Sequence, residues 1–95
     1  MPAITGCTTQ QFLPNANLRV EIITTPATAD SGDTIDISSA AATGGNTLKS
    51  LTGILIVFDT TTGDVVTGTW SGTTVTIDAS GGTTNHVYVV FAIGT

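Results

Sequence analysis

Two stretches of the chain are apolar at nearly every position, although the whole sequence has only 95 residues. LTGILIVFD (51–59) and HVYVVFAI (86–93) carry large apolar side chains at both odd and even positions. Because successive side chains of a strand point to opposite faces, each stretch predicts a strand that is buried on both sides. A domain of this length has one core. The second apolar face must therefore be covered by something else, or the fold must wrap around both faces.

We prefer the interpretation that another subunit covers the second face, because exposed apolar patches of several hundred Å² usually mark interfaces. The alternative is a closed core that these side chains line beneath the N-terminal part of the chain. Both interpretations concern the same candidate partner-binding residues, which are Ile54, Ile56, Phe58, Tyr88 and Val90. The first interpretation predicts a homo-oligomer.

Four shorter stretches alternate between apolar and polar residues, as strands with one buried face do. They span residues 18–24, 34–38, 64–70 and 73–79. In the first, Leu18, Val20 and Ile22 form one face, and Arg19 and Glu21 form the other. In the second and fourth, the apolar residues predicted to point inward are Ile35, Ile37, Val75 and Ile77.

Gly-rich and Thr-rich turns separate these stretches, and Ser71-Gly72 is predicted to form a two-residue hairpin loop. The Gly-rich stretch 39–46 is expected to form a loop, and no segment shows a helical period. Threonine favours the pleated surface of a sheet and tolerates water, so these strands can stay solvated with little charge. The fold class predicted is all-β, a small antiparallel β-sandwich or β-barrel of about six to seven strands.

Residues 1–17, MPAITGCTTQQFLPNAN, show no clear period and end in a turn signal. We expect an extended N-terminal arm, followed by a single β-domain over residues 18–95. Phe12 and Leu13 are apolar residues in a polar stretch, so we expect them to bind a partner or to dock on their own domain. If they bind a partner, deletion of residues 1–13 should leave the β-domain folded.

The charge balance excludes two classes of partner. Arg19 and Lys49 are the only basic side chains besides His86, and the formal net charge is −5. Nucleic-acid binding needs clustered Lys and Arg, and binding to an anionic membrane surface needs the same. No apolar run approaches the ~18 residues of a membrane span. The first residues, MPAITG, lack the pattern of a secretory signal, so we expect synthesis in a cytosol.

No set of residues predicts a reaction. His86 is the only histidine and Cys7 the only cysteine. A Cys7–His86 pair could form a nucleophilic site in principle, but Cys7 is expected in the arm and His86 is expected to be an ordinary surface residue. One Cys and one His cannot hold structural zinc. The sequence therefore predicts a protein that is not an enzyme and that needs no cofactor.

Two further kinds of site were considered. Asp30, Asp33 and Asp36 could offer oxygens to Ca²⁺, but their spacing is not that of an EF-hand loop, so turn capping is expected instead. Phe12, Trp70 and Tyr88 could form a stacking platform for a sugar. For Trp70 we expect packing in a core or an interface.

The C-terminal third of the chain resembles a known group of proteins. TTTGDVVTGTWSGTTVTIDASGGTTNHVYVVFAIGT (60–95) is similar to the C-terminal halves of small structural proteins of tailed-bacteriophage virions, particularly capsid decoration (cement) proteins. The shared features are the Thr/Gly-rich hairpins, the scarcity of lysine, the run TTGDV…TW…VTID and a terminal strand like HVYVVFAIG.

The resemblance implies a β-rich protein, often trimeric, that is made in the host cytoplasm and sits on the outer capsid surface. It implies two partners, which are further copies of the chain and a major capsid protein or another virion protein. It also implies an arm that grips the shell. The competing interpretation is a carbohydrate-binding or adhesin-like β-sandwich module.

Overall fold

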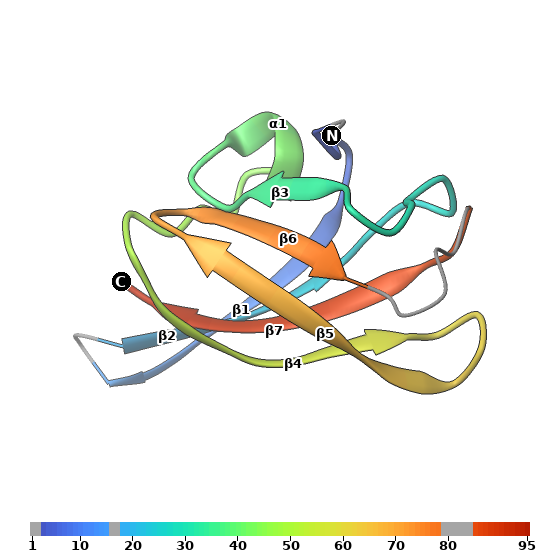
Figure 1. The fold of residues 1–95 in the computed structure, drawn as a ribbon. Coiled ribbons are helices and arrows are strands. Elements are labelled where there is room, and N and C mark those ends of the chain that lie inside the picture. Colours follow the sequence, from blue (N-terminus) through green and yellow to red (C-terminus); the bar gives the residue numbers. More distant parts are fainter. Residues whose placement is uncertain (1–2, 16–17, 79–84) are drawn as a thin grey trace.

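The computed structural model describes residues 3–15, 18–78 and 85–95 of the chain (Figure 1). Within these residues the protein is all-β, with seven strands and one four-residue helix, which confirms the predicted fold class. The strands are β1 (Thr8–Asn15), β2 (Leu18–Thr24), β3 (Thr34–Asp36), β4 (Leu51–Asp59), β5 (Asp64–Ser71), β6 (Thr74–Asp78) and β7 (Tyr88–Gly94), and the helix is α1 (Ala40–Thr43).

All seven strands belong to one antiparallel sheet with the order β1-β2-β7-β4-β5-β6-β3. Strand β5 changes partner along its length, because residues 64–66 face β4 and residues 67–71 pair with β6. The sheet therefore curls over on itself. Strands β1, β2, β7 and β4 form a lower layer, and the end of β5 with β6 and β3 forms an upper layer (Figure 1).

The β5–β6 hairpin lies close to its predicted position. Ser71 pairs with Thr74, so the two-residue loop is Gly72-Thr73, one residue later than we expected. Gly72 has a φ of 60°. A hairpin loop whose first central residue has a positive φ favours glycine, which has no Cβ to collide with the backbone. The glycine therefore fixes the register of this hairpin.

The N-terminal segment (residues 3–15) belongs to the sheet, which corrects the expectation of an arm ahead of the domain. Ala3 forms a parallel bridge with Thr34 of β3, and the Ile4 amide donates to the Thr34 carbonyl at 2.8 Å. Farther along, β1 pairs with β2 over residues 8–15. The segment thus joins the two edge strands of the sheet. Ile4 and Cys7 are buried in the core, so this part of the chain contributes to the domain itself.

Helix α1 lies where we expected a loop. The Ser39 side chain caps its first turn by accepting a hydrogen bond from the Ala42 amide. A helix of four residues is too short to produce a helical period in the sequence. The helix covers the N-terminal segment, since the amides of Gly6 and Cys7 donate to the carbonyls of Ala41 and Ala42.

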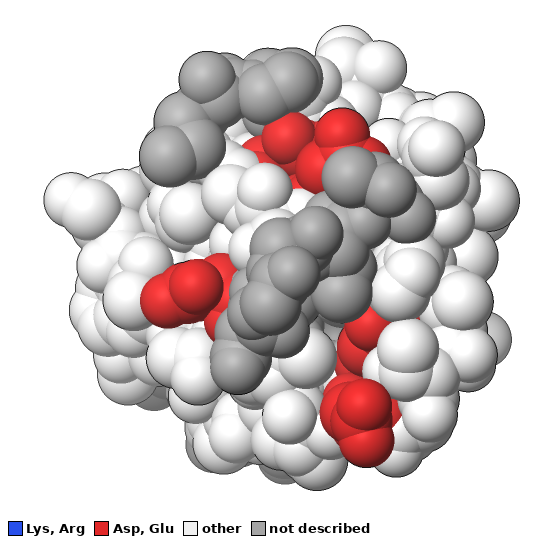
Figure 2. Space-filling view, turned by 45° about the vertical axis from the view of Figure 1, so that its right-hand side comes forward, with Lys and Arg blue, Asp and Glu red and all other residues white. Residues whose placement is uncertain are grey.

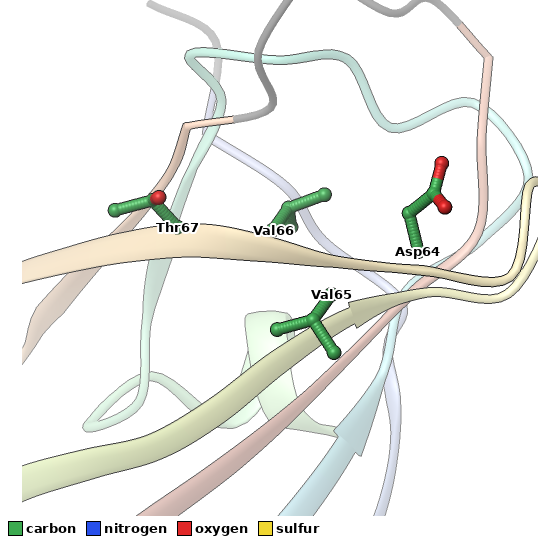
Figure 3. Close-up of a pocket in the computed structure, with 4 residues that line it drawn as sticks. All are labelled: Asp64, Val65, Val66 and Thr67. Atoms are coloured by element: carbon green, nitrogen blue, oxygen red, sulfur yellow. The ribbon is translucent and has the colours of Figure 1, made fainter.

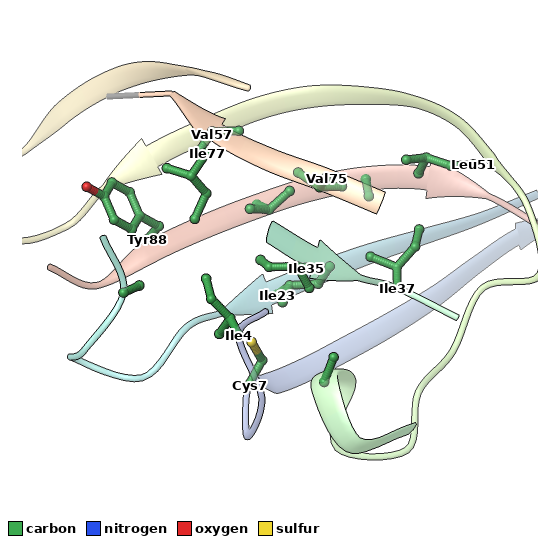
Figure 4. Packing of buried hydrophobic residues seen from close by; sticks show 14 of the residues in the cluster. Ile4, Cys7, Ile23, Ile35, Ile37, Leu51, Val57, Val75, Ile77 and Tyr88 are labelled. Carbon is green, nitrogen blue, oxygen red and sulfur yellow. The ribbon is translucent and has the colours of Figure 1, made fainter. Parts of the chain in front are cut away.

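The core lies between the two layers (Figure 4). Ile35 and Ile37 from β3 and the turn after it, and Val75 and Ile77 from β6, are fully buried, which confirms their predicted inward orientation. The lower layer supplies the opposing residues, which are Ile23, Leu51, Val57, Tyr88, Val90 and Ala92.

Candidate functional site

The lower layer has a second apolar surface on the side that faces away from the core. Residues directly opposite each other in an antiparallel pair share one face of the sheet. In the central row, Ile22 of β2 lies opposite Phe91 of β7, and Phe91 lies opposite Ile56 of β4. Two flanking rows continue the pattern across the same strands. We call this surface the outer face, and it consists of Phe12, Val20, Ile22, Ile56, Phe58, Val65, Val89, Phe91 and Ile93.

The outer face is exposed to different degrees along its length. Val65 is 66% exposed, Phe12 51% and Ile56 36%, and the other six side chains are half-buried. Figure 3 shows the Val65 side chain leaving β5 on the opposite side from Asp64 and Val66, which places Val65 on the outer face. The exposed apolar area is on the order of 500 Å², at the upper end of the ~300–600 Å² of the largest patch on a typical monomer.

Charge is excluded from this surface. In the described rows of β1, β2 and β7, the polar residues on the same side are Thr8, Gln10 and Thr24. The charged residues of β2, Arg19 and Glu21, have the opposite orientation. An apolar sheet face without a charged side chain is typical of a surface that is covered in the working state of the protein.

The structure separates the candidate residues that the sequence had grouped. Ile56, Phe58 and Phe12 lie on the outer face. Tyr88 and Val90 are fully buried in the core, and Ile54 packs against that core. The double-sided character of β4 and β7 is therefore real, with one set of residues in the core and a second set outside it. Leu13 is 57% exposed.

Strand β4 also carries an exposed leucine at a bulge. The pairing with β7 shifts between Ile54 and Ile56, which leaves Leu55 as an extra residue, 62% exposed. Bulges are frequent at sheet edges, where they bend a strand and redirect a side chain.

Of the two faces of β2, the less apolar one points toward the core. Leu18, Val20 and Ile22 form the apolar face that the alternation indicates, but the buried positions are Glu21 and Ile23. A glutamate points inward while a run of apolar residues points outward. The inward side is held by Ile23, which is fully buried, and by the hydrogen bond that Glu21 accepts from Gln11. The apolar side that remains at the surface supports the interpretation that the outer face meets a partner.

Glu21 is fully buried, and only one of its two carboxylate oxygens has a hydrogen-bond partner in the described part of the chain. Its Oε1 accepts a hydrogen bond from Gln11 Nε2 at 2.9 Å, whereas its Oε2 has no partner in the described part of the chain. Burial raises the pKa of the Glu21 carboxyl, and the Gln11 hydrogen bond only partly opposes this. Gln11 in turn accepts a hydrogen bond from Arg19 at 3.0 Å.

We predict that Glu21→Gln stabilises the protein at neutral pH. Because the pKa of Glu21 is raised above its ordinary 4.5, the folded state loses stability as pH rises from that value through the folded-state pKa. A gain of about 1 kcal/mol, the low end of the cost of an unpaired buried group, would raise Tm by about 4–8 °C. Thermal unfolding between pH 4 and pH 8 measures this.

The two melting curves should approach each other toward pH 4, where the carboxyl is mostly protonated in both states. Asp64→Asn, which removes an exposed carboxylate, is the control and should change stability by less than about 0.5 kcal/mol. A constant difference between Glu21→Gln and the natural protein at every pH would contradict the prediction.

His86 is not the ordinary surface residue that we expected. Its Nδ1 lies 2.7 Å from Oδ2 of Asp59, whose side chain is 1% exposed. The other carboxylate oxygen of Asp59 accepts hydrogen bonds from the amides of Thr61 and Thr62. Burial would raise the pKa of Asp59, but the hydrogen bonds from His86 and these amides outweigh it and hold the pKa below its ordinary value. The pair therefore anchors the β4–β5 turn to the start of β7.

A histidine–aspartate pair supplies two of the three members of a catalytic triad, but no nucleophile is placed beside it in the described residues. Cys7 is buried in the core, where burial raises the pKa of its thiol to about 11, so the reactive thiolate is rare at neutral pH. His86 contacts Asp59 instead of Cys7. A hollow beside β5 is lined by residues 64–67, with one carboxylate and no histidine or cysteine in its described lining (Figure 3).

The acidic residues serve turns, as expected. Asp30 accepts a hydrogen bond from the Asn85 amide, Asp33 accepts from the Asp30 amide, and Asp36 accepts from Ser38 and Thr73. Within the described ranges, no group of three or more His, Cys, Asp or Glu side chains is placed to hold a metal ion.

The two basic residues lie at one end of the molecule, close to Glu21, and acidic residues also lie at the other end. Arg19 lies opposite Gly94, and the Lys49 amide donates to the Thr95 carbonyl, so both basic residues lie where β7 ends. Asp59 and Asp64 lie at the other end, where β7 begins. Figure 2 shows acidic side chains and no basic ones on the face that it displays.

The chain has no detected relatives. No protein-family model, curated protein or solved structure matches it. Among the described residues, no helix is long and apolar enough to cross a membrane. Functional inference therefore depends on the surfaces described above.

Proposed function

We propose that this protein is a non-enzymatic structural protein of a bacteriophage virion, which decorates the outer surface of the capsid and stabilises it. The observation that carries the proposal is the uncharged, apolar outer face across five strands of a small domain. Among the described residues, this apolar surface is one face of a sheet, and exposed apolar surfaces of this size are suited to assembly with other proteins.

The exposed surface of the upper layer fits the same role. Thr67, Thr69 and Ser71 are exposed along β5, so this layer is coated with small hydroxyl side chains. Such a surface stays hydrated without lysine or arginine. It therefore offers few trypsin cleavage sites, which is an advantage for a component of a particle outside the cell.

The β1–β2 hairpin provides the contact with the shell. Leu13 is 57% exposed near the end of β1, on the hairpin that extends to the left in Figure 1. Since residues 3–7 are tied into the domain, the element that grips the capsid is this hairpin rather than a free arm.

We predict that Leu13→Ser weakens attachment to capsids while the domain stays folded. Burial of a leucine side chain contributes roughly 1.5–3 kcal/mol, so each copy should bind about 10–100-fold more weakly. Co-sedimentation of the purified protein with capsid shells that lack it measures this change. Leu55→Ser is the matched control, because Leu55 is equally exposed but lies on β4. Undiminished binding of Leu13→Ser would refute the hairpin contact.

A carbohydrate-binding module is the second candidate, and one observation favours it. Trp70 is 43% exposed, although we expected it to pack in a core or an interface. An exposed tryptophan can stack on a sugar ring. Titration of the protein with cell-surface glycans, followed by Trp70 fluorescence, tests this candidate. Saturable quenching that Trp70→Ala removes would favour it over capsid decoration.

A further inference from the structure

We propose that the outer face is the contact surface of a two-fold homodimer, in which a second copy of this chain lies face to face on the first. The resemblance to capsid decoration proteins predicted a trimer. The distribution of apolar and charged residues in this chain favours two copies instead. The dimer goes beyond the proposed function, because it would form without a capsid.

The first argument is that the outer face of one copy is complementary to the outer face of a second copy. The outer face carries no charged side chain that a second copy would leave unpaired. In the described rows of β1, β2 and β7, the polar residues on the same side are Thr8, Gln10 and Thr24, all on β1 and β2. The exposed apolar area of the outer face, on the order of 500 Å², is a large part of the ~800 Å² that each partner buries in a standard interface. Two sheets that pack face to face interdigitate their side chains as in a β-sandwich core.

The second argument is symmetry. A surface can meet the same surface of an identical copy only across a two-fold axis. In a three-fold ring each contact joins two different patches, so three copies would leave part of the outer face in water or require a second apolar patch. The described exposed apolar residues away from the outer face, Leu13, Leu55 and Trp70, lie on three different strands.

The dimer also explains the orientation of β2. With a second copy in place, the side of β2 that carries Val20 and Ile22 is buried in the interface. The side that carries Glu21 is then the less apolar of two buried sides. Each copy would then keep one face of the lower layer in its own core and the other in the shared interface. The apolar character of β4 and β7 on both faces follows directly.

The test is sedimentation equilibrium of the full chain at concentrations from 1 to 100 µM, chosen to span the typical affinities of such interfaces. We expect a species of twice the 9.6 kDa chain mass. Ile56→Lys places a charge in the central row of the outer face, and its dissociation constant should rise tenfold or more. Thr69→Lys adds the same charge on the upper layer and is the matched control, which should remain dimeric.

Circular dichroism and the melting temperature verify that every variant is folded. Should Ile56→Lys unfold, Val65→Lys replaces it, since Val65 is 66% exposed and tolerates a long side chain.

Several results would overturn the proposal. These are a monomer at 100 µM, a trimer, or a folded outer-face variant that dimerises as well as the natural protein. Capsid binding is measured separately with Leu13→Ser. A dimer that ignores capsids refutes only the proposed function, and a monomer that coats capsids refutes only the dimer.

Discussion

Gly94→Ala is expected to destabilise the protein more than any other single methyl addition in the described strands. Gly94 is buried at the end of β7, where β2 and β4 flank it. A Cβ at this position would overlap the carbonyl oxygen of Ser50 and crowd the backbone of Leu51. These are backbone atoms, so no change of rotamer can relieve the collision and the strands must separate.

The expected loss is about 3 kcal/mol, the upper part of the range for overpacking in a core. For a domain of this size that loss lowers Tm by about 12–24 °C. Thermal unfolding followed by circular dichroism measures it. Gly53→Ala is the control, because no heavy atom lies within 4 Å of the position that its Cβ would take. Equal melting temperatures for the two variants would show that β7 does not approach Ser50 closely.

Alternation predicted most strands but could not say which face of a strand meets the core. In β3 and β6 the apolar residues Ile35 and Val75 point inward, as expected. In β2 the apolar face is as clear, yet it points outward, and Glu21 is buried. A period of two identifies two faces. Which of them is covered depends on pairing with β7, which lies some seventy residues away in the sequence and leaves no local signal.

Other parts of the fold escaped prediction because they lack a pattern. Strand β1 alternates poorly, since its inward residue Gln11 is polar and binds Glu21. The His86–Asp59 contact joins residues 27 positions apart, and no spacing rule applies to such a pair. For α1, the one usable signal was Ser39, a favourable N-cap residue before three alanines.

The sequence predicted what kind of surface the candidate site is, but it identified only some of the residues that form it. Apolar residues on both faces of β4 and β7 correctly indicated a second apolar surface. Among them, Ile56 and Phe58 lie on it, whereas Tyr88 and Val90 do not. The two β4 bulges explain part of the difficulty, because each changes which residues share a face. Val20 and Ile22 could be assigned to the outer face only from the pairing of β2 with β7.

Deletion of residues 1–7 is expected to abolish the stable fold rather than to release a free-standing β-domain. The deletion removes Ile4 and Cys7 from the core. It also removes three backbone hydrogen bonds, in which the amides of residues 4, 6 and 7 donate to β3 and α1. Burial of one isoleucine contributes roughly 1.5–3 kcal/mol, and each hydrogen bond contributes about 0.5–1.5 kcal/mol.

The combined loss is about 3–7.5 kcal/mol before the burial of Cys7 is counted, comparable with the whole free energy of unfolding of a small domain, about 5–15 kcal/mol. The truncated chain should therefore show no cooperative melting transition, or one lowered by more than about 12 °C. Two point variants isolate the cause. Ile4→Ala should cost about 2–5 kcal/mol, whereas Thr5→Ala, at the exposed neighbouring position, should cost less than about 0.5 kcal/mol. If the truncated protein melts like the full chain, the N-terminal segment is a separate arm and does not close the sheet.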